Sequence, residues 1–213
     1  MTTDGDGKAT ISTLDLDPDT YTASIAFEGN NMYNPSSTTT TIVVDKYSSA
    51  LTSSDVTTVY NGGKSLVATL KDGKGNAIKG ANVTVKLAGI SRTLITDSDG
   101  QVSLSTDNIV PDSYIADISF SGDMKHYASS TTARVTVNKV HTALTADDVV
   151  TVYNDGKSLT ATLKDGDGKA ISKVDVTVKV GDVVKTLNTD SKGSVSLSTD
   201  GLVPDVYMAN IDF

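Results

Sequence analysis

Cysteine and tryptophan are absent from this chain of 213 residues, and histidine occurs only at positions 126 and 141. Without cysteine the chain can form neither a disulfide framework nor a zinc–thiolate centre, and it has no cysteine nucleophile. We expect His126 and His141 to be solvated surface residues, because neither recurs at an equivalent position elsewhere in the chain. No apolar run approaches the roughly 20 residues that a membrane-spanning helix needs, so we expect no membrane span in this segment.

Positive charge is also scarce. The chain has 18 Lys and Arg against 26 Asp and Glu, which gives a net charge of −8. A protein that binds the phosphate backbone needs a basic face, so we expect no nucleic-acid partner. Glu28 is the only glutamate, and the other 25 of the 26 acidic residues are aspartate. Aspartate favours turns and caps, whereas glutamate favours helices.

Threonine, serine and valine dominate what is present, with 30 Thr, 24 Ser and 24 Val. Threonine and valine are branched at Cβ, which stiffens χ1 and suits a pleated, half-buried surface. The chain also has 17 glycines, many of them beside aspartate in turn-like clusters. The composition therefore predicts an all-β protein with short strands and tight turns.

A repeat of 93 residues runs through the whole chain. Residues 47–120 match residues 140–213 without a gap, with 45 identities in 74 pairs. The same offset relates residues 1–46 to 94–139, with 19 identities in 46 pairs. A module of about 90 residues has the usual size of an immunoglobulin-like β-sandwich and is too long for the common solenoid and propeller repeats.

The repeat predicts three parts of unequal completeness. Residues 47–139 are a complete immunoglobulin-like module, residues 1–46 are the C-terminal half of such a module, and residues 140–213 are a module that lacks its last strand. The outer parts can be completed in two ways: by a longer continuous array, or by strand addition from residues 28–46 of a neighbouring copy.

Tiling favours the longer array. The chain exceeds two periods by 27 residues, so joining copies end to end would duplicate residues 1–27 against 187–213. A unit built for strand exchange should tile without such a surplus.

Period-two alternation of apolar residues predicts about seven strands and no helix in the complete module. The side chains expected to be buried are Leu66, Leu70, Val83, Val85, Leu104, Tyr114, Ile118 and Phe120. The predicted strands are Val56–Tyr60, Ser65–Lys71, Asn82–Leu87, Ser91–Thr96, Gln101–Ser105, Tyr114–Phe120 and Ala133–Val137.

A Pro-Asp-x-Tyr motif opens one strand in every module, with its tyrosine at positions 21, 114 and 207. This pattern predicts a tyrosine corner, in which the phenol bonds back to the backbone just upstream. The alternative is a plain core tyrosine. Both interpretations are structural.

These residues carry a family resemblance that covers the whole chain. Residues 60–87, YNGGKSLVATLKDGKGNAIKGANVTVKL, and residues 96–123, TDSDGQVSLSTDNIVPDSYIADISFSGD, resemble the tandem bacterial immunoglobulin-like (Big) repeats of prokaryotic surface proteins. They are most similar to the adhesin-like proteins of methanogenic archaea. One departure concerns the usual Pro-Gly-x-Tyr of that pattern, which is Pro-Asp-x-Tyr in all three copies here.

Asp/Gly clusters are the first candidates for ligand binding, as at residues 4–7, 97–100 and 165–168. Aspartates two positions apart can contribute to a calcium site. However, the equivalent clusters at residues 72–75 and 190–193 have lysine in place of the second acid. A β-turn explains every copy, so we favour turns and expect no metal, cofactor-binding or catalytic residue.

The sequence also contains candidate modification sites. Asn82 begins the one usable N-glycosylation sequon, and the Thr38–Thr41 run could carry O-linked sugar or simply face outward from a strand. Lys86 and Lys179 could form an isopeptide cross-link only if they were buried beside an acid. By alternation, both point outward.

The resemblance implies an extracellular, cell-surface location and a non-enzymatic structural role. We expect a segment of a stalk or fibre, which can also take part in adhesion. Its partners would be neighbouring modules, other copies of itself, or a cell-surface glycan or protein. The alternative is a carbohydrate- or protein-binding adhesin module, which the lack of tryptophan and of aromatic clusters disfavours. The short link Val137–Val140 has no Gly/Ser run, so a stiff joint is expected.

Overall fold

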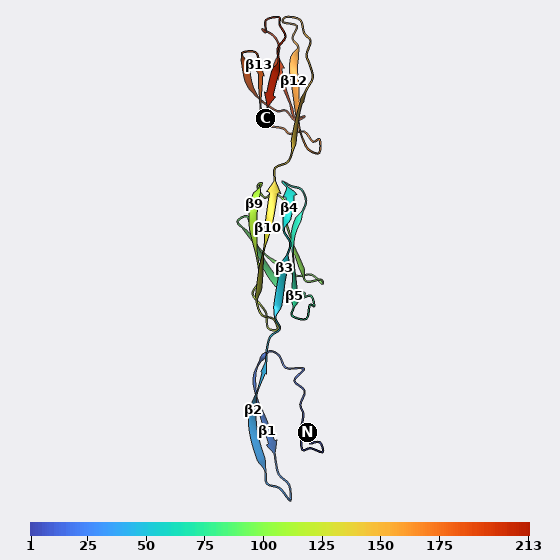
Figure 1. Ribbon diagram of the computed structural model, residues 1–213, viewed down its shortest axis with the longest axis vertical. Helices are drawn as coiled ribbons and strands as arrows, with labels where there is room; N and C mark the ends of the chain where they lie inside the picture. The colour runs from blue at the N-terminus through green and yellow to red at the C-terminus, as the bar shows by residue number, and fades with distance from the viewer. The chain divides into compact units, whose positions relative to one another are not determined.

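The computed structural model describes residues 1–213, which form strands and turns and no helix, as predicted (Figure 1). The chain folds into two compact units, residues 1–138 and 139–213. The first unit contains a two-stranded hairpin followed by a complete β-sandwich. The second contains a smaller sandwich.

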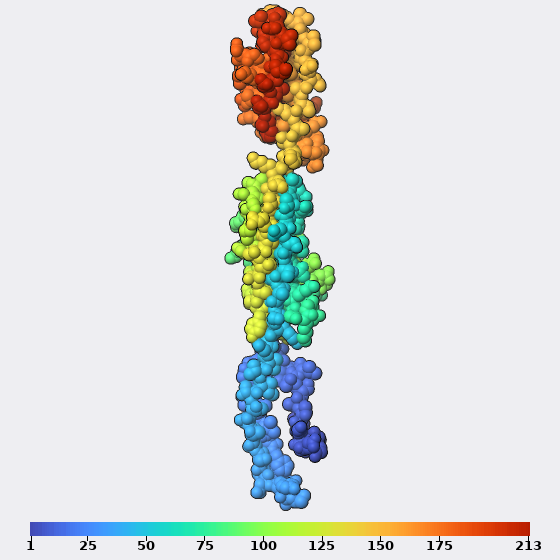
Figure 2. Space-filling view, viewed as in Figure 1, coloured from blue at the N-terminus to red at the C-terminus, as the bar shows by residue number.

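Residues 49–138 form an immunoglobulin-like β-sandwich. One sheet has the order β3-β5-β8 and the other the order β4-β10-β9-β6-β7. All neighbours are antiparallel except β4 and β10, which run parallel. The yellow β10 lies alongside the cyan β3 and β4 in Figure 2. The strands are β3 (Ser49–Ser53), β4 (Val56–Val59), β5 (Ser65–Asp72), β6 (Asn82–Leu87), β7 (Ile90–Ile95), β8 (Gln101–Ser105), β9 (Asp112–Phe120) and β10 (Ser129–Asn138).

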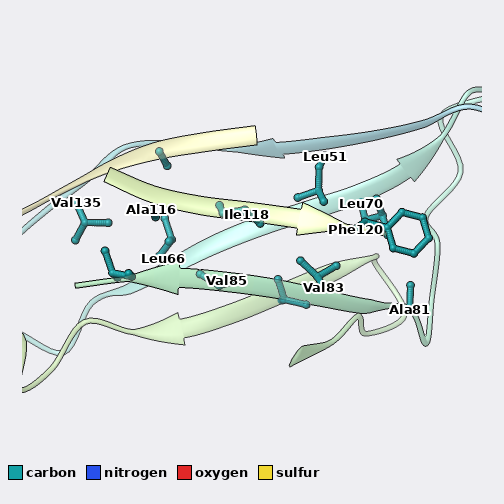
Figure 3. Packing of buried hydrophobic residues seen from close by; sticks show 14 of the residues in the cluster. Leu51, Leu66, Leu70, Ala81, Val83, Val85, Ala116, Ile118, Phe120 and Val135 are labelled. Atoms are coloured by element: carbon teal, nitrogen blue, oxygen red, sulfur yellow. The ribbon is translucent and has the colours of Figure 1, made fainter. Parts of the chain in front are cut away.

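The inward-facing side chains of both sheets meet in one core, shown in Figure 3. Burying one such aliphatic side chain contributes about 1.5–3 kcal/mol. Two of the eight residues expected in the core, Leu104 and Tyr114, are only partly buried and pack against it. The other six are confirmed as buried: Leu66, Leu70, Val83, Val85, Ile118 and Phe120.

The sandwich has one strand more than the pattern predicts. β3 has a single buried apolar residue, Leu51, beside an exposed alanine, two serines and a threonine, so its own sequence shows little alternation. Its pairing with β5 makes it a strand. The chain then crosses at Ser54 and Asp55 into the other sheet, where β4 begins at Val56.

In residues 1–46 the regular structure is one antiparallel hairpin, formed by β1 (Asp19–Phe27) and β2 (Ser36–Val44). Its register repeats that of β9 and β10, because Ala23 pairs with Thr40 as Ala116 pairs with Ala133. Several of its apolar side chains remain exposed. Ile25 is 54% exposed and Phe27 is 45% exposed.

Residues 139–213 form two three-stranded sheets, with orders β11-β12-β15 and β14-β13-β16. A small core of Ala161, Leu163, Val176, Val178, Val180 and Val195 lies in this unit. Residues 149–152, the counterparts of β4, are not a strand here. The strands are β11 (Thr142–Ala146), β12 (Ser158–Asp165), β13 (Asp175–Val180), β14 (Val183–Asn188), β15 (Ser194–Ser198) and β16 (Ala209–Asp212).

Candidate functional site: turns, corners and the joint at residues 45–48

The predicted tyrosine corner is confirmed in all three copies. The hydroxyls of Tyr21, Tyr114 and Tyr207 each donate a hydrogen bond to the carbonyl oxygen four residues upstream, at 2.8–2.9 Å. In the preceding Pro-Asp step, the aspartate carboxylate accepts a hydrogen bond from the next backbone N–H at 2.7 Å. Aspartate therefore replaces the usual glycine without loss of the corner.

The Asp/Gly clusters are turns closed by their first aspartate. In each, one carboxylate oxygen accepts hydrogen bonds from the backbone N–H groups two and four residues further on. The glycine three residues on has a positive φ, between 73° and 87°, a region that residues with a Cβ rarely adopt. The five closing aspartates are Asp4, Asp72, Asp97, Asp165 and Asp190.

This geometry supports the turn interpretation of the clusters. The hydrogen bonds from the N–H groups of Ser194 and Lys192 lower the pKa of the Asp190 carboxyl, because they stabilise its charged form. No group of three or more His, Asp or Glu side chains comes together where it could hold a metal ion.

Most of the other candidate residues from the sequence are exposed. Asn82, the Thr38–Thr41 run and His141 are exposed. Lys86 and Lys179 are exposed too, as alternation predicts, so neither is a buried cross-linking lysine. The expectation that His126 is a solvated surface residue is wrong. Its side chain is only 17% exposed, because its backbone and ring are held against Asp123 and the ring lies near an aromatic residue.

A set of polar contacts surrounds residues 45–48, which link β2 to β3. We call this segment the joint. Tyr47 forms a short parallel bridge with the loop between β9 and β10: its N–H donates to Lys125 O and its carbonyl accepts from the N–H of Tyr127, both at 2.9 Å. Ser49 adds a bond from its hydroxyl to Tyr127 O at 2.7 Å.

Side chains hold the joint as well. Lys46 Nζ donates to Asp123 O at 2.6 Å, and the Tyr127 hydroxyl donates to the Asp45 carboxylate. The hydrogen bond from Tyr127 to Asp45 favours a charged carboxylate and a neutral phenol. It therefore lowers the pKa of Asp45 and raises the pKa of Tyr127.

The ring of Tyr47 contacts two other groups. Lys74 Nζ sits 4.6 Å from its ring centroid and 3.3 Å from its hydroxyl oxygen. The second group is the imidazole of His126, whose ring centroid is 6.2 Å from that of Tyr47. Its Nδ1 is 2.9 Å from Asp123 Oδ1. A cation near an aromatic face contributes about 0.5–1 kcal/mol at exposed sites. These contacts restrain the linker further.

The repeat did not reveal this joint, because the residues that form it differ between the modules. Tyr47 corresponds to Val140, Lys74 to Asp167 and His126 to Tyr33. A repeat search emphasises matching positions, whereas these residues are the ones that differ. These differing residues all fall in segments that meet at one end of the middle sandwich. Their departure from the repeat is the sequence feature that could have indicated the joint.

No deep cleft accompanies these features. A shallow hollow of about 350 Å³ is lined by Ser, Thr and Val side chains and by Asp55, with no aromatic residue. Asp55 already accepts a hydrogen bond from the backbone N–H of Arg134 at 2.7 Å. No helix in the structure is long and apolar enough to span a membrane.

No protein-family model matches the chain, and no curated protein matches it. Solved structures do align. A 1.5-MDa bacterial ice-binding adhesin aligns at 15% identity and TM-score 0.39, over 85% of this chain and 63% of that one. A Ca²⁺-stabilized adhesin of an ice-binding Antarctic bacterium aligns at 13% identity and TM-score 0.34, over 90% and 55%.

The adhesin InvE of Yersinia pseudotuberculosis aligns at 18% identity and TM-score 0.35, over 70% of this chain and 50% of that one. The chain thus spans 63% and 55% of the first two adhesin chains. At these identities and TM-scores the alignments add nothing about ligand or activity. The immunoglobulin-like fold rests on the strand order and core described above.

Proposed function

We propose that the chain is a segment of an extracellular, cell-surface stalk or fibre built from tandem immunoglobulin-like modules. Its role is mechanical and non-enzymatic, and it can contribute to adhesion. In this proposal residues 1–46 are the C-terminal half of one module, residues 47–139 a complete module, and residues 140–213 a module lacking its last strand. The resemblance to Big repeats and methanogen adhesin-like proteins supports this assignment.

The observation that carries the proposal is the joint. A flexible linker between independent domains has few contacts with either neighbour. Here Tyr47 is bonded through its backbone to the loop between β9 and β10, and Asp45, Lys46 and Tyr47 each add a side-chain contact. Restraint of this kind transmits bending load from one module to the next.

The partners follow from the same organisation. They are the neighbouring modules of the array and other copies of the chain. A cell-surface glycan or protein as ligand is the second candidate, but the shallow hollow near Asp55 has no aromatic side chain on which a sugar ring could stack. The mechanical role is therefore the better supported.

Distances between paired spin labels test the joint directly. The chain has no cysteine, so Thr39→Cys and Thr131→Cys place labels on β2 and β10 without background. We expect a narrow distance distribution that broadens when Asp45→Ala and Tyr127→Phe remove the side-chain bond. A control pair inside the middle sandwich, at Thr131 and Ser103, should not change. A broad distribution in the unaltered joint would refute a stiff stalk.

Location needs its own experiment. Antibodies raised against residues 47–139 should label intact cells of the source organism without permeabilisation. Labelling that requires permeabilised cells would contradict the surface assignment.

A further inference from the structure

The N-glycosylation sequon Asn82-Val83-Thr84 opens strand β6. Because side chains alternate along a strand, Asn82 and Thr84 stand on the outer face of the sheet, while Val83 points into the core (Figure 3). Asn82 is exposed and Val83 is fully buried. The fold therefore presents both polar members of the sequon on one outer surface.

The residue opposite Asn82 differs in kind between the two units. Asn82 pairs with Ile95 of β7, and this isoleucine is 69% exposed. In the second unit the equivalent pair is Asp175 and Asn188, and Asn188 Nδ2 donates a hydrogen bond to Asp175 Oδ1 at 2.9 Å. The side chain of Ile95 has no polar atom, so it cannot partner the Asn82 amide in this way. The middle sandwich thus has an amide facing water beside an uncovered apolar side chain, where the second unit has a closed polar pair.

The cross-strand neighbours of the sequon leave room for a large uncharged group. Thr84 lies between Thr93 of β7 and Ser119 of β9, and the hydroxyl oxygens of the two threonines are 3.3 Å apart. A Cβ added at Gly80, two residues before Asn82, would meet nothing within 4 Å. A group attached to Asn82 therefore meets hydroxyls, one isoleucine and open solvent.

We propose that Asn82 carries an N-linked glycan whose first sugar ring packs on Ile95. The donor class is an oligosaccharide attached to a lipid through phosphate. Transfer forms a bond between Asn82 Nδ2 and the anomeric carbon of the sugar, and the bond from that carbon to the phosphate oxygen breaks. The phosphate keeps the electron pair, and the amide nitrogen gives up one proton. The C–H face of the ring then covers Ile95 and removes apolar surface from water.

Transfer precedes the pairing of β6, because the folded strand is held on both sides by β7 and β9. β7 itself ends the five-stranded sheet, so its outer edge is unpaired. A bulky, hydrated glycan beside this edge hinders other strands from pairing with it. This inference rests on the proposed function, because N-linked glycans mark the surfaces of exported chains.

Mass spectrometry of the protein isolated from its source cells is the test. Trypsin, which cuts after lysine, releases residues 80–86 with the whole sequon, and residues 174–179 as their equivalent from the second unit. Fragmentation should place sugar mass on Asn82 in the first peptide. The second peptide has Asp175 at that position and should carry none.

Two variants of Thr84 are matched controls, because the sequon requires a hydroxyl at this position. Thr84→Ser should keep the glycan. Thr84→Val should lose it while leaving a β-branched residue in the strand. An unmodified first peptide in the unaltered protein, or sugar that persists in Thr84→Val, would overturn the inference.

The same preparation separates this inference from the proposed function. An unmodified peptide in protein that antibodies detect on intact cells would overturn the glycan site and leave the stalk function standing. A glycan on protein that antibodies reach only in permeabilised cells would support the site and contradict the surface role.

The contact with Ile95 has its own readout. The glycosylated protein should unfold a few degrees above the Thr84→Val protein, because only the glycan covers Ile95. Ile95→Ser should abolish this difference. Ile115→Ser should retain it, because Ile115 is 52% exposed but lies on β9 outside the residues that pair with β6. Equal differences in the two variants would refute the packing of the sugar on Ile95.

Discussion

The middle sandwich and the unit of residues 139–213 have closely related sequences and different cores. Over 74 aligned pairs they share 45 identities, and Leu70 and Leu163 are each fully buried. On the opposite side of the sandwich the two diverge. Ile118 is 1% exposed, whereas the equivalent Ile211 is only partly buried.

The difference shows which part of the fold is locally determined. The strands that carry Leu70 and Val83 keep their pairing and burial in both units. The segment equivalent to β4 and the strand equivalent to β9 depend on β10, which binds both of them in the middle sandwich. One strand therefore converts a partial core into a complete one.

The largest expected effect contrasts two isoleucines. Ile118→Ala should destabilise the middle sandwich by about 2–5 kcal/mol, because it opens a cavity in a sealed core. Ile211→Ala should cost clearly less, about 1–2 kcal/mol, because its surroundings are already partly exposed. Urea denaturation of the two single variants measures both values. Equal losses would mean that β10 does not determine the burial at this position.

The next effect concerns two glycines with similar positive φ. A Cβ at Gly100 would lie 2.3 Å from the carbonyl oxygen of Leu70, whereas a Cβ at Gly75 would meet nothing within 4 Å. Gly100→Ala should cost more than about 2 kcal/mol, and Gly75→Ala about 1 kcal/mol from the backbone conformation alone.

Gly193 extends this test to the second unit, because its Cβ would lie 2.3 Å from Leu163 O. Gly193→Ala should therefore be as damaging locally as Gly100→Ala. A mild effect at Gly193 would show that this turn is not equally well formed in both units.

The sequence predicts the strands in which apolar side chains alternate, and it fails for strands that depend on pairing with a partner strand. Alternation identified the inward residues of β5, β6 and β9, where apolar side chains recur at every second position. It could not find β3, in which Leu51 is the one buried apolar residue and pairing with β5 decides the conformation. Residues 56–59 and 149–152 have closely similar sequences, yet only the first form a strand, because only they have β10 as a partner.

The tyrosine corners provide a smaller contrast. Tyr114→Phe removes the bond to Val110 O and should cost about 1 kcal/mol. Tyr207 makes the same bond to Val203 O but is 37% exposed, so Tyr207→Phe should cost less because water can replace the lost partner. Thermal unfolding of the two variants compares them. A greater loss at Tyr207 would contradict the view that its unit is less completely packed.

The smallest effect concerns pH at the joint. The lowered pKa of Asp45 means that its contribution is present above the unfolded value of 3.8 and is lost as pH falls through the folded pKa. The raised pKa of Tyr127 means that its contribution is present below 10.0 and is lost as pH rises through the folded pKa. The hydrogen bond between Tyr127 and Asp45 should therefore contribute fully between pH 3.8 and pH 10.0.

Asp45→Asn tests this bond, since it gives the joint the residue found at the equivalent Asn138. Phenolate absorbance should show one tyrosine titrating at lower pH in the variant than in the unaltered chain. An unchanged titration curve would mean that the two groups do not interact in solution.

Hydrogen exchange tests the central claim most directly, because it compares β6 (Asn82–Leu87) with its counterpart β13 (Asp175–Val180) in one sample. We predict slower exchange in β6, and we predict that joining residues 121–139 after Phe213 slows β13 to nearly the rate of β6. Equal rates in the unextended chain at low concentration, or no change in β13 after the extension, would contradict the conclusion that a single strand completes the core.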